Sequence, residues 1–298
     1  MRSPRLTIGL ITYNGARHIE RSLESLLAQR FSDFKLLIFD NASEDGTSAI
    51  CARVAAADPR VVHHRHPKTI PQSANFEAAL AAAETEYFMW ATDDDLWLED
   101  FAEGCITHLD ATQEAVSACT KVIFRDEAGR STAARSTFTV RGTVRERLAS
   151  YLANPRDNAR LYGVYRTSAL RQSYPSGICS FGYDWIIVAL TLLQGAHIEV
   201  PTTSLVRTAN APGKYFGSFG RHFAGPSGLQ GRLERLLPLL STTLELRRRL
   251  PRAVWRHVFW KLVRLNLHQA LLLIRWKIPS FEPIFVSLRR LDRALGNS

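Results

Sequence analysis

The sequence has little cysteine, and its four cysteines lie far apart. They are Cys51, Cys105, Cys119 and Cys179, and no two of them have the C-x-x-C spacing. Zinc sites and disulfide frameworks both depend on cysteines at short, recurring spacings. We therefore expect reduced thiols, with neither a cysteine-bound zinc ion nor a disulfide framework.

Long apolar runs are also missing. No stretch reaches the roughly 20 apolar residues that a membrane-spanning helix needs. Residues Met1–Arg5 lead directly into a strand-like segment, without the apolar core and cleavage site of a secretory signal. We expect a cytoplasmic protein whose 298 residues form one sizeable core and a smaller appendage.

Positive charge is not in excess over the first two thirds of the chain. Residues 1–204 contain 21 Lys and Arg against 24 Asp and Glu, whereas residues 205–298 contain 17 against 4. The net charge of +10 therefore arises in the C-terminal third. Nucleic-acid enzymes line their catalytic grooves with positive charge, so this distribution argues against a nucleic-acid partner. It favours an attachment surface in the C-terminal third.

Apolar patterning predicts an α/β fold. The apolar runs Leu6–Thr12 and Phe34–Phe39 flank Arg17–Gln29, where apolar side chains recur at helical spacing. Strand, helix and strand form a βαβ unit, and the pattern repeats up to a strand over Glu86–Ala91. We predict a Rossmann-like, mostly parallel sheet flanked by helices.

The second half of the chain is expected to complete this sheet and to add a helical extension. Further elements are predicted as a strand over Ala115–Arg125, a strand over Leu161–Tyr165, a helix over Asp184–Gln194, and a strand over Ile198–Val206 interrupted by Pro201. The predicted domains are a catalytic domain over residues 1–209, a flexible Gly-, Pro- and Ser-rich loop over 210–231, and a basic helical extension over 232–298.

Carboxylates follow several of the predicted strands. Asp40 comes directly after one apolar run, and Asp93, Asp94 and Asp95 follow another. Adjacent carboxylates repel one another unless a cation compensates, and Mg²⁺ or Mn²⁺ binds one or two carboxylates together with phosphate oxygens. The acidic run therefore predicts a site for a metal diphosphate, although it could also be a solvated turn. Asp40 alone is equally consistent with an Asx turn.

These residues, taken in order, resemble the family 2 glycosyltransferases, which have the nucleotide-diphospho-sugar transferase fold known as GT-A. The resemblance is good over about residues 6–125 and weaker over 158–207. Its segments are Thr12-Tyr13-Asn14, Asp40–Thr47, Asn75, Trp90–Trp97, Tyr162–Arg166 and Phe181–Trp185.

The resemblance implies an inverting glycosyltransferase that uses a nucleotide-diphosphate sugar, with UDP as the expected nucleotide. The residues implied to contact the donor are Thr12, Tyr13, Asn14, Asp40, Asn75, Asp93 and Asp94. Asp95 would bind Mn²⁺ or Mg²⁺. The acceptor would be a glycan or a lipid-linked molecule, and the alternative is a nucleotide-sugar-binding module without turnover.

Asp184 matches the general base of the family. Aromatic neighbours should raise the pKa of this carboxyl toward a value useful for taking a proton from an acceptor hydroxyl. The alternative is that Asp184 only caps the helix that follows it. The chain lacks the Gln-x-x-Arg-Trp run of processive polysaccharide synthases, so we expect a single transfer rather than polymerisation.

The stretch Arg252–Lys277 combines an apolar helical stripe with basic residues and three tryptophans. The stripe consists of Val254, Val258, Leu262 and Leu265. A basic amphipathic helix with Trp is typical of docking on an anionic membrane surface, here the inner face of the membrane. Packing against the catalytic domain or in a homodimer remains an equal alternative.

Overall fold

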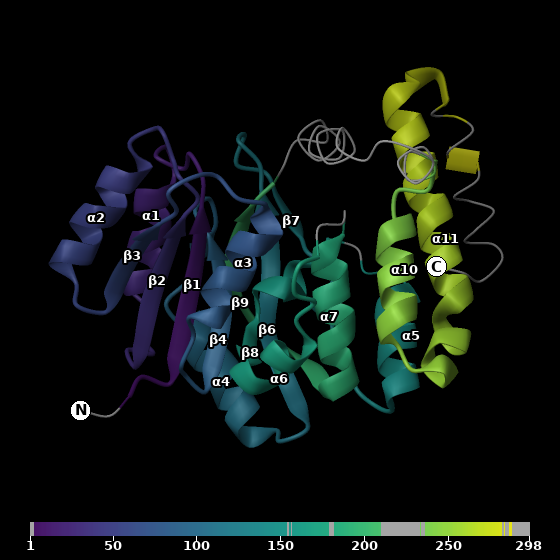
Figure 1. Cartoon of the computed structure of the whole chain (residues 1–298), viewed down its shortest axis with the longest axis horizontal. Coiled ribbons are helices and arrows are strands. Elements are labelled where there is room, and N and C mark those ends of the chain that lie inside the picture. Colours follow the sequence, from purple (N-terminus) through teal and green to yellow (C-terminus); the bar gives the residue numbers. More distant parts are fainter. Residues whose placement is uncertain are drawn as a thin grey trace. The chain divides into compact units, whose positions relative to one another are not determined.

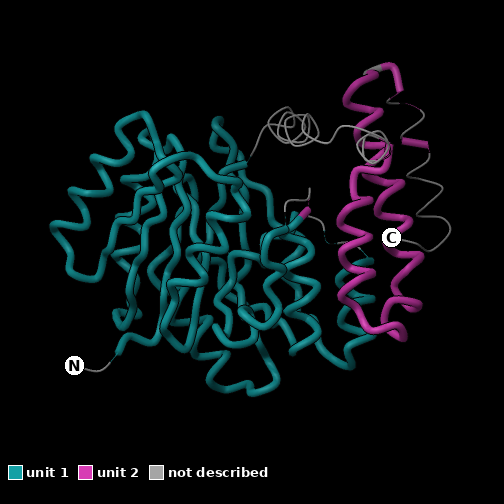
Figure 2. The backbone as a smooth tube through the Cα atoms, in the orientation of Figure 1, with its two compact units in different colours: residues 1–179, 183–209 teal, residues 180–182, 210–298 magenta. Residues whose placement is uncertain are grey.

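The computed structural model describes residues 3–153, 155, 157–178, 182–209, 233, 236–281, 283 and 286–287. The chain divides into two compact units (Figure 2), residues 1–179 with 183–209 and residues 180–182 with 210–298. The predicted loop over 210–231 and Cys179 lie outside the described residues. Cys51, Cys105 and Cys119 are buried free thiols.

The first unit alternates strands and helices (Figure 1). Its strands are β1 (Leu6–Thr12), β2 (Phe34–Asp40), β3 (Val61–Arg65), β4 (Tyr87–Thr92), β5 (Leu96–Trp97), β6 (Ala115–Arg125), β7 (Ser131–Ala133), β8 (Val164–Arg166) and β9 (Ala196–Thr208). Its helices are α1 (Ile19–Leu27), α2 (Thr47–Ala57), α3 (Gln72–Ala81), α4 (Phe101–Ala111), α5 (Val144–Ala153), η1 (Ala159–Tyr162), α6 (Thr167–Ser173) and α7 (Tyr183–Gln194).

The strands form one sheet in the order β3-β2-β1-β4-β8-β6-β9-β5, with β7 paired to β6. β3, β2, β1 and β4 are mutually parallel, β8 is antiparallel to its two neighbours, and β6 and β9 are parallel. The α/β prediction with a mostly parallel sheet is thus confirmed. The parallel half places its strand carboxyl ends at one edge, which is where such sheets bind ligands.

Alternate residues of the central strands pack on opposite faces of the sheet. Leu6, Ile8 and Leu10 of β1 belong to a core cluster with side chains from α1, α2 and α4. On the other face, the ring of Phe76 from α3 lies 5.5 Å from that of Trp90 in β4. Because both faces are covered, β1 is buried throughout its length.

Gly9 allows α3 to approach β1 closely. A Cβ at this position would lie 2.9 Å from the ring of Phe88 and 3.0 Å from Cβ of Ala79. Glycine is therefore required by the packing at this point of the strand.

Two predicted strands differ in detail from the observed ones. The expected strand over Leu161–Tyr165 is wrong in its first half, because Ala159–Tyr162 forms a 3₁₀ turn and β8 begins only at Val164. The expected interruption at Pro201 is confirmed, since the β6–β9 register shifts there and Lys121 pairs with Thr203. Proline has no N–H to donate to the ladder.

The second unit is helical in its described part, with α10 (Leu240–Arg249), α11 (Arg252–Lys277) and the short η2 (Pro279–Phe281). Asn266 of α11 accepts a hydrogen bond from the backbone of Leu239 at 3.1 Å and donates to Thr243 at 2.8 Å. Of the two alternatives predicted for the apolar stripe, docking on lipid or packing, its burial fits packing, with Val258 fully inaccessible and Leu262 nearly so. Among the described helices, none is both long enough and apolar enough to cross a bilayer.

Candidate active site

The carboxyl ends of β1, β2 and β4 bring the predicted donor residues together. Thr12 pairs with Asp40 across β1 and β2, and Ile11 pairs with Thr92 across β1 and β4. The Thr12 hydroxyl donates to Oδ2 of Asp93 at 2.5 Å. The convergence predicted from strand ends is confirmed.

The turns after β1 and β2 are joined by hydrogen bonds through Asn14. The backbone N–H of Asn14 donates to Oγ of Ser43, and the backbone N–H of Glu44 donates back to Oδ1 of Asn14, both at 2.9 Å. Asn14 has a φ of 52°, a left-handed conformation that asparagine tolerates better than most residues. Asn14 therefore connects the two turns through its backbone and its side chain.

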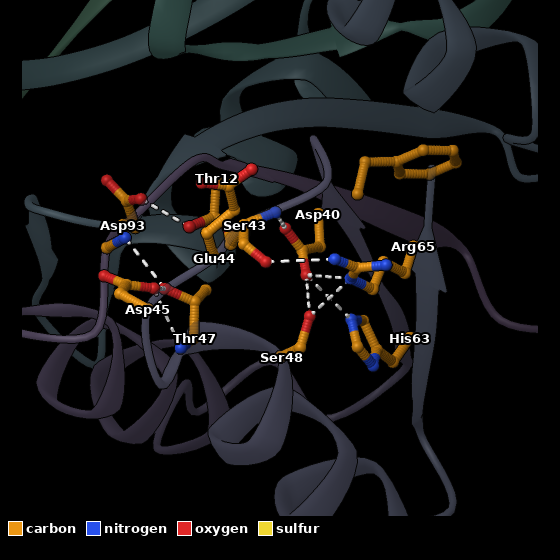
Figure 3. Close-up of polar contacts among 12 residues, drawn as sticks. Thr12, Asp40, Ser43, Glu44, Asp45, Thr47, Ser48, His63, Arg65 and Asp93 are labelled. Atoms are coloured by element: carbon orange, nitrogen blue, oxygen red, sulfur yellow. Dashed lines mark hydrogen bonds and ion pairs between the residues drawn. The ribbon is translucent and has the colours of Figure 1, made fainter. Parts of the chain in front are cut away.

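Asp40 is fully buried and has several partners (Figure 3). Its carboxylate accepts hydrogen bonds from the backbone N–H of Ser43 at 2.9 Å and from the Ser48 hydroxyl. Side-chain nitrogens of His63 and Arg65 lie 3.7 Å from its Oδ2. Burial acts to raise the pKa of Asp40, but these hydrogen bonds outweigh burial and hold the pKa below its usual value.

Asn75 is also buried, between β2 and the segment after β3. Its Nδ2 donates to the carbonyl of Phe39 at 3.1 Å, and its Oδ1 lies 2.8 Å from Nε2 of His66. In this arrangement Asp40 and Asn75 order the chain around the strand ends. Their predicted contacts with a donor remain predictions.

Tyr13 is exposed, with 51% of the residue accessible to solvent. It follows Thr12, which is buried at the end of β1. An exposed aromatic ring beside a strand end is able to stack against a nucleobase.

The first carboxylate of the acidic run is half-buried. Burial raises the pKa of Asp93 to about 6, the hydrogen bond from Thr12 opposes that rise, and the charge of Asp94 adds to it. A half-buried carboxylate with a raised pKa is one that a cation would stabilise in its ionised form.

Gly15 passes very close to Asp93. A Cβ on Gly15 would lie 2.7 Å from Cγ of Asp93 and 2.8 Å from the Thr12 hydroxyl oxygen. The absence of a side chain at Gly15 therefore leaves room for the Asp93 carboxylate.

Asp95 is 1% exposed and is paired with Arg207. Nε of Arg207 donates to its Oδ2 at 2.6 Å, Thr92 donates to the same oxygen at 2.8 Å, and the backbone N–H of Thr208 donates to Oδ1 at 2.9 Å. The Arg207 guanidinium carbon also lies 3.9 Å from the centroid of the Tyr162 ring. Burial acts to lower the pKa of Arg207, but the ion pair with Asp95 outweighs it and keeps the guanidinium charged.

Asp184 lies in the first turn of α7 and is half-buried. Burial raises its pKa, and the hydrogen bond that its Oδ2 accepts from Nδ2 of Asn158 at 2.9 Å opposes the rise. The backbone of Trp185 and the charge of Arg207 act in the same direction as Asn158. The raised pKa is the direction that the sequence predicted for a base.

Metal ligation depends on few groups at this site. Within the described ranges, no cluster of three or more His, Cys, Asp or Glu side chains forms a metal site by itself. The half-buried Asp93 and Asp94 provide oxygen ligands of the kind that Mg²⁺ and Mn²⁺ use together with phosphate oxygens. A cation bound to Asp95 would have to share the carboxylate with Arg207 or displace Arg207 from it.

Sequence reasoning missed Arg207 and Asn158. Arg207 lies near the end of a long strand, and its partner Asp95 is 112 positions away. Asn158 precedes a 3₁₀ turn over Ala159–Tyr162, and the strand predicted in this region began only at Leu161. Neither residue belongs to a motif whose spacing would have indicated its partner.

The pattern of glycosyl transferase family 2 matches residues 7–174, which is more than half of the chain. The chain belongs to that family. A relative from Nostoc, an uncharacterized glycosyltransferase, is 28% identical over 93 residues, or 31% of this chain and 29% of the relative. The match thus spans less than a third of that relative's length.

Solved structures share the fold of this family member. TarS residues 1–349 from S. aureus, in complex with UDP-GlcNAc, align over 96% of this chain and 87% of that chain, with a TM-score of 0.57 and 14% identity. A mannosyltransferase from Pyrobaculum calidifontis, in complex with GDP-Man and Mn²⁺, aligns over all of this chain and 82% of that chain, with a TM-score of 0.54 and 16% identity. These likenesses support the GT-A fold.

Proposed function

We propose that this protein transfers a sugar from a nucleotide-diphosphate sugar, with UDP-sugars as the first candidates, to a hydroxyl of a glycan or lipid-linked acceptor. The observation that carries the proposal is the convergence of Thr12, Asp93 and Asp95 at the carboxyl edge of the sheet in a member of this family. A carboxylate with a raised pKa, Asp184, is available as the base. UDP-GlcNAc, present in the TarS complex, is a sensible first donor to test.

The donor would lie along the strand ends. Tyr13 offers an exposed ring to the base, and the turns held by Asn14 and Asp40 provide a fixed backbone beside it. Asp93 and Asp94 would lie near the ribose and the diphosphate. Mn²⁺ or Mg²⁺ held by the acidic run would neutralise charge on the departing diphosphate.

Asp184 would take the proton from the acceptor hydroxyl as that oxygen attacks the anomeric carbon. A new carbon–oxygen bond forms, the bond to the diphosphate breaks, and its electron pair leaves with the nucleotide. Direct displacement by one nucleophile inverts the anomeric configuration without a covalent enzyme intermediate. Arg207, already charged and near Asp184, adds positive charge to this side of the site.

The second unit favours a membrane-linked acceptor. Trp260 of α11 is 74% exposed, and Leu267 and Ile274 are exposed at seven-residue intervals from it, on one side of the helix. Arg252 and Arg256 are exposed on the same helix. This exposed row of apolar side chains is separate from the buried stripe of the same helix. Bordered by basic residues, it suits docking on an anionic bilayer surface. The competing outcome is that this exposed row contacts a second copy of the chain in a homodimer.

A screen of nucleotide sugars with Mn²⁺ tests the main proposal. Release of the nucleoside diphosphate from one donor is expected for the wild type. Asp184→Asn should lower turnover by about 10²-fold or more, while donor affinity stays within a few-fold. Binding of a donor without any turnover would support the alternative of a non-catalytic nucleotide-sugar-binding module. Collapse of donor affinity in Asp184→Asn would show a binding role for this residue instead.

A further inference from the structure

A buried hydrogen-bonded chain leads from α5 to the carboxylate of Asp184. The hydroxyl of Tyr151 donates to Oδ1 of Asn158 at 2.8 Å, and Nδ2 of Asn158 donates to Oδ2 of Asp184 at 2.9 Å. Tyr151 and Asn158 are both buried. The three side chains come from α5, the segment before η1, and α7.

The two partners of Asn158 fix which way its amide points. With its oxygen toward the Tyr151 hydroxyl, its NH₂ group faces the carboxylate. The reverse orientation would set the amide oxygen against the negative charge of Asp184. The hydrogen bond that Asn158 donates to this carboxylate would then be lost. Tyr151 therefore helps to present a donor, rather than an acceptor, to Asp184.

The backbone of Asn158 is held in an uncommon conformation. Its φ of 49° and ψ of 29° are left-handed, a region in which non-glycine residues are rare and asparagine is enriched. The neighbouring Asp157 fixes this segment, because its carboxylate accepts hydrogen bonds from the Ser136 hydroxyl and from the backbone N–H of Arg135. Residues in such conformations persist where the surroundings determine them, and they concentrate at functional sites.

We propose that Asn158 is a positioning residue for the general base, that it anchors Oδ2 of Asp184 so that Oδ1 receives the acceptor's proton, and that Tyr151 orients Asn158. This inference rests on the proposed function, because it gives Asn158 a role relative to Asp184 as base.

The electrostatic surroundings of Asp184 agree with this assignment. The phenols of Tyr151, Tyr162 and Tyr183 and the cation of Arg207 interact with it. Burial raises the pKa of Asp184, and the donor from Asn158 holds the rise in check. Burial makes Asp184 a stronger base, and Asn158 would keep it ionised by limiting how far its pKa rises.

The test combines Asn158→Gly, Tyr151→Phe and a control, Ser136→Ala. Glycine accepts the left-handed backbone without strain, so Asn158→Gly removes the amide while keeping the turn. Tyr151→Phe removes only the hydroxyl that orients the amide. Ser136→Ala removes a side chain that pins the same segment, through Asp157 and the backbone N–H of Ala159, without contacting Asp184.

The direct measurement is the pKa of Asp184 by NMR of protein labelled with ¹³C-carboxyl aspartate, with its resonance assigned by loss in Asp184→Asn. We expect Asn158→Gly to raise this pKa by about one unit, Tyr151→Phe to raise it less, and Ser136→Ala to leave it unchanged. An unchanged pKa in Asn158→Gly would overturn the inference. An equal rise in Ser136→Ala would also overturn it, because a general loosening of the segment would then be the cause.

Turnover separates this inference from the function on which it rests. With UDP-GlcNAc and other donors, nucleoside diphosphate release by Asn158→Gly should fall about 10-fold or more, and the acid limb of its pH profile should move upward with the pKa. If Asp184→Asn abolishes release but Asn158→Gly keeps the wild-type rate and pH profile, the positioning role of Asn158 is wrong. The assignment of Asp184 as the base is then unaffected. If Asp184→Asn keeps full turnover, the proposed base itself is wrong.

Discussion

The Nε atom of Arg207 lies 2.6 Å from Oδ2 of Asp95 and joins the end of β9 to the last carboxylate of the acidic run. Asp95 is almost completely buried, and the Arg207 side chain is 14% exposed. Burying a carboxylate at such depth costs free energy unless an opposite charge compensates for it, and Arg207 provides that charge. The acidic run is thus divided, with Asp95 neutralised by the protein and Asp93 left with a raised pKa.

Removing Arg207 should leave the buried Asp95 carboxylate without a compensating cation. We expect Arg207→Leu to lower the free energy of unfolding by about 3 kcal/mol, because the charge on Asp95 is left buried and unpaired. Adding MnCl₂ should recover part of that loss, since a divalent ion can then bind the carboxylate. Urea denaturation with and without Mn²⁺ measures both effects.

The double variant Asp95→Asn with Arg207→Leu is the control. It has no buried charge at this point, so Mn²⁺ should raise its free energy of unfolding by less than it raises that of Arg207→Leu. A Mn²⁺ response of equal size in the single and double variants would show that the metal binds elsewhere.

The room beside Asp93 should matter for binding as well as for folding. In Gly15→Ala the new methyl group would collide with the carboxylate of Asp93 and with Thr12. We expect the affinity for a UDP-sugar with Mn²⁺ to fall about 10-fold or more, while the free energy of unfolding falls by about 1–3 kcal/mol. Isothermal titration calorimetry and urea denaturation measure the two quantities.

Gly46→Ala is a matched control in the facing turn. There a Cβ would lie 3.8 Å from that of Ala16, which is ordinary contact, and the φ of −68° suits alanine. This variant should bind the donor normally. Equal losses of affinity in the two variants would show that any stiffening of these turns, rather than displacement of Asp93, impairs binding.

The sequence was sufficient for the elements that depend on local pattern. The end of an apolar run marks the end of a buried strand, and parallel strands share an edge, so Thr12, Asp40 and Asp93 could be brought together in advance. The contact between Arg207 and Asp95 could not, because it depends on the register of β9 with β5 and β6, which no local pattern specifies. Exposure also escaped prediction: Asp40 is buried, whereas Tyr13 is exposed.

His197 should make the protein sensitive to acid. It is buried, its Nε2 lies 3.0 Å from the Thr191 hydroxyl, and its Nδ1 has no hydrogen-bond partner among the described residues. Burial, together with the charges of Arg160 and Arg147, lowers its pKa well below the usual value of 6.5. The unfolded chain therefore binds a proton at a pH at which the folded chain does not.

The sign follows directly from this difference. Above about pH 6.5, His197 should leave the free energy of unfolding unchanged. Below that pH, it should reduce the free energy of unfolding by about 1.4 kcal/mol for each pH unit. His197→Gln cannot be protonated, so the difference in stability between wild type and variant should change with this slope between pH 6.5 and 5. Parallel curves for the two proteins would show that His197 titrates normally in the fold.

The last prediction concerns α11, whose exposed side combines Trp260, Leu267 and Ile274 with basic residues. If this side docks on anionic lipid, the protein should sediment with liposomes that contain phosphatidylglycerol, and salt should release it, because screening limits the attraction to about 8 Å at physiological ionic strength. Replacing Arg252, Arg256 and Lys277 with Gln should weaken binding by about 150-fold at most, since each basic residue contributes about 1 kcal/mol.

A variant of equal charge distinguishes a specific surface from the total charge of the protein. Arg30, Arg53 and Arg130 are exposed in the first unit, and replacing them with Gln removes the same three charges. This control should bind liposomes like the wild type, whereas Trp260→Ala should weaken binding even at high salt, because it removes apolar rather than electrostatic attraction. Concentration-dependent dimerisation that Trp260→Ala abolishes, with liposome binding absent throughout, would instead assign this side of α11 to contact between two copies of the chain.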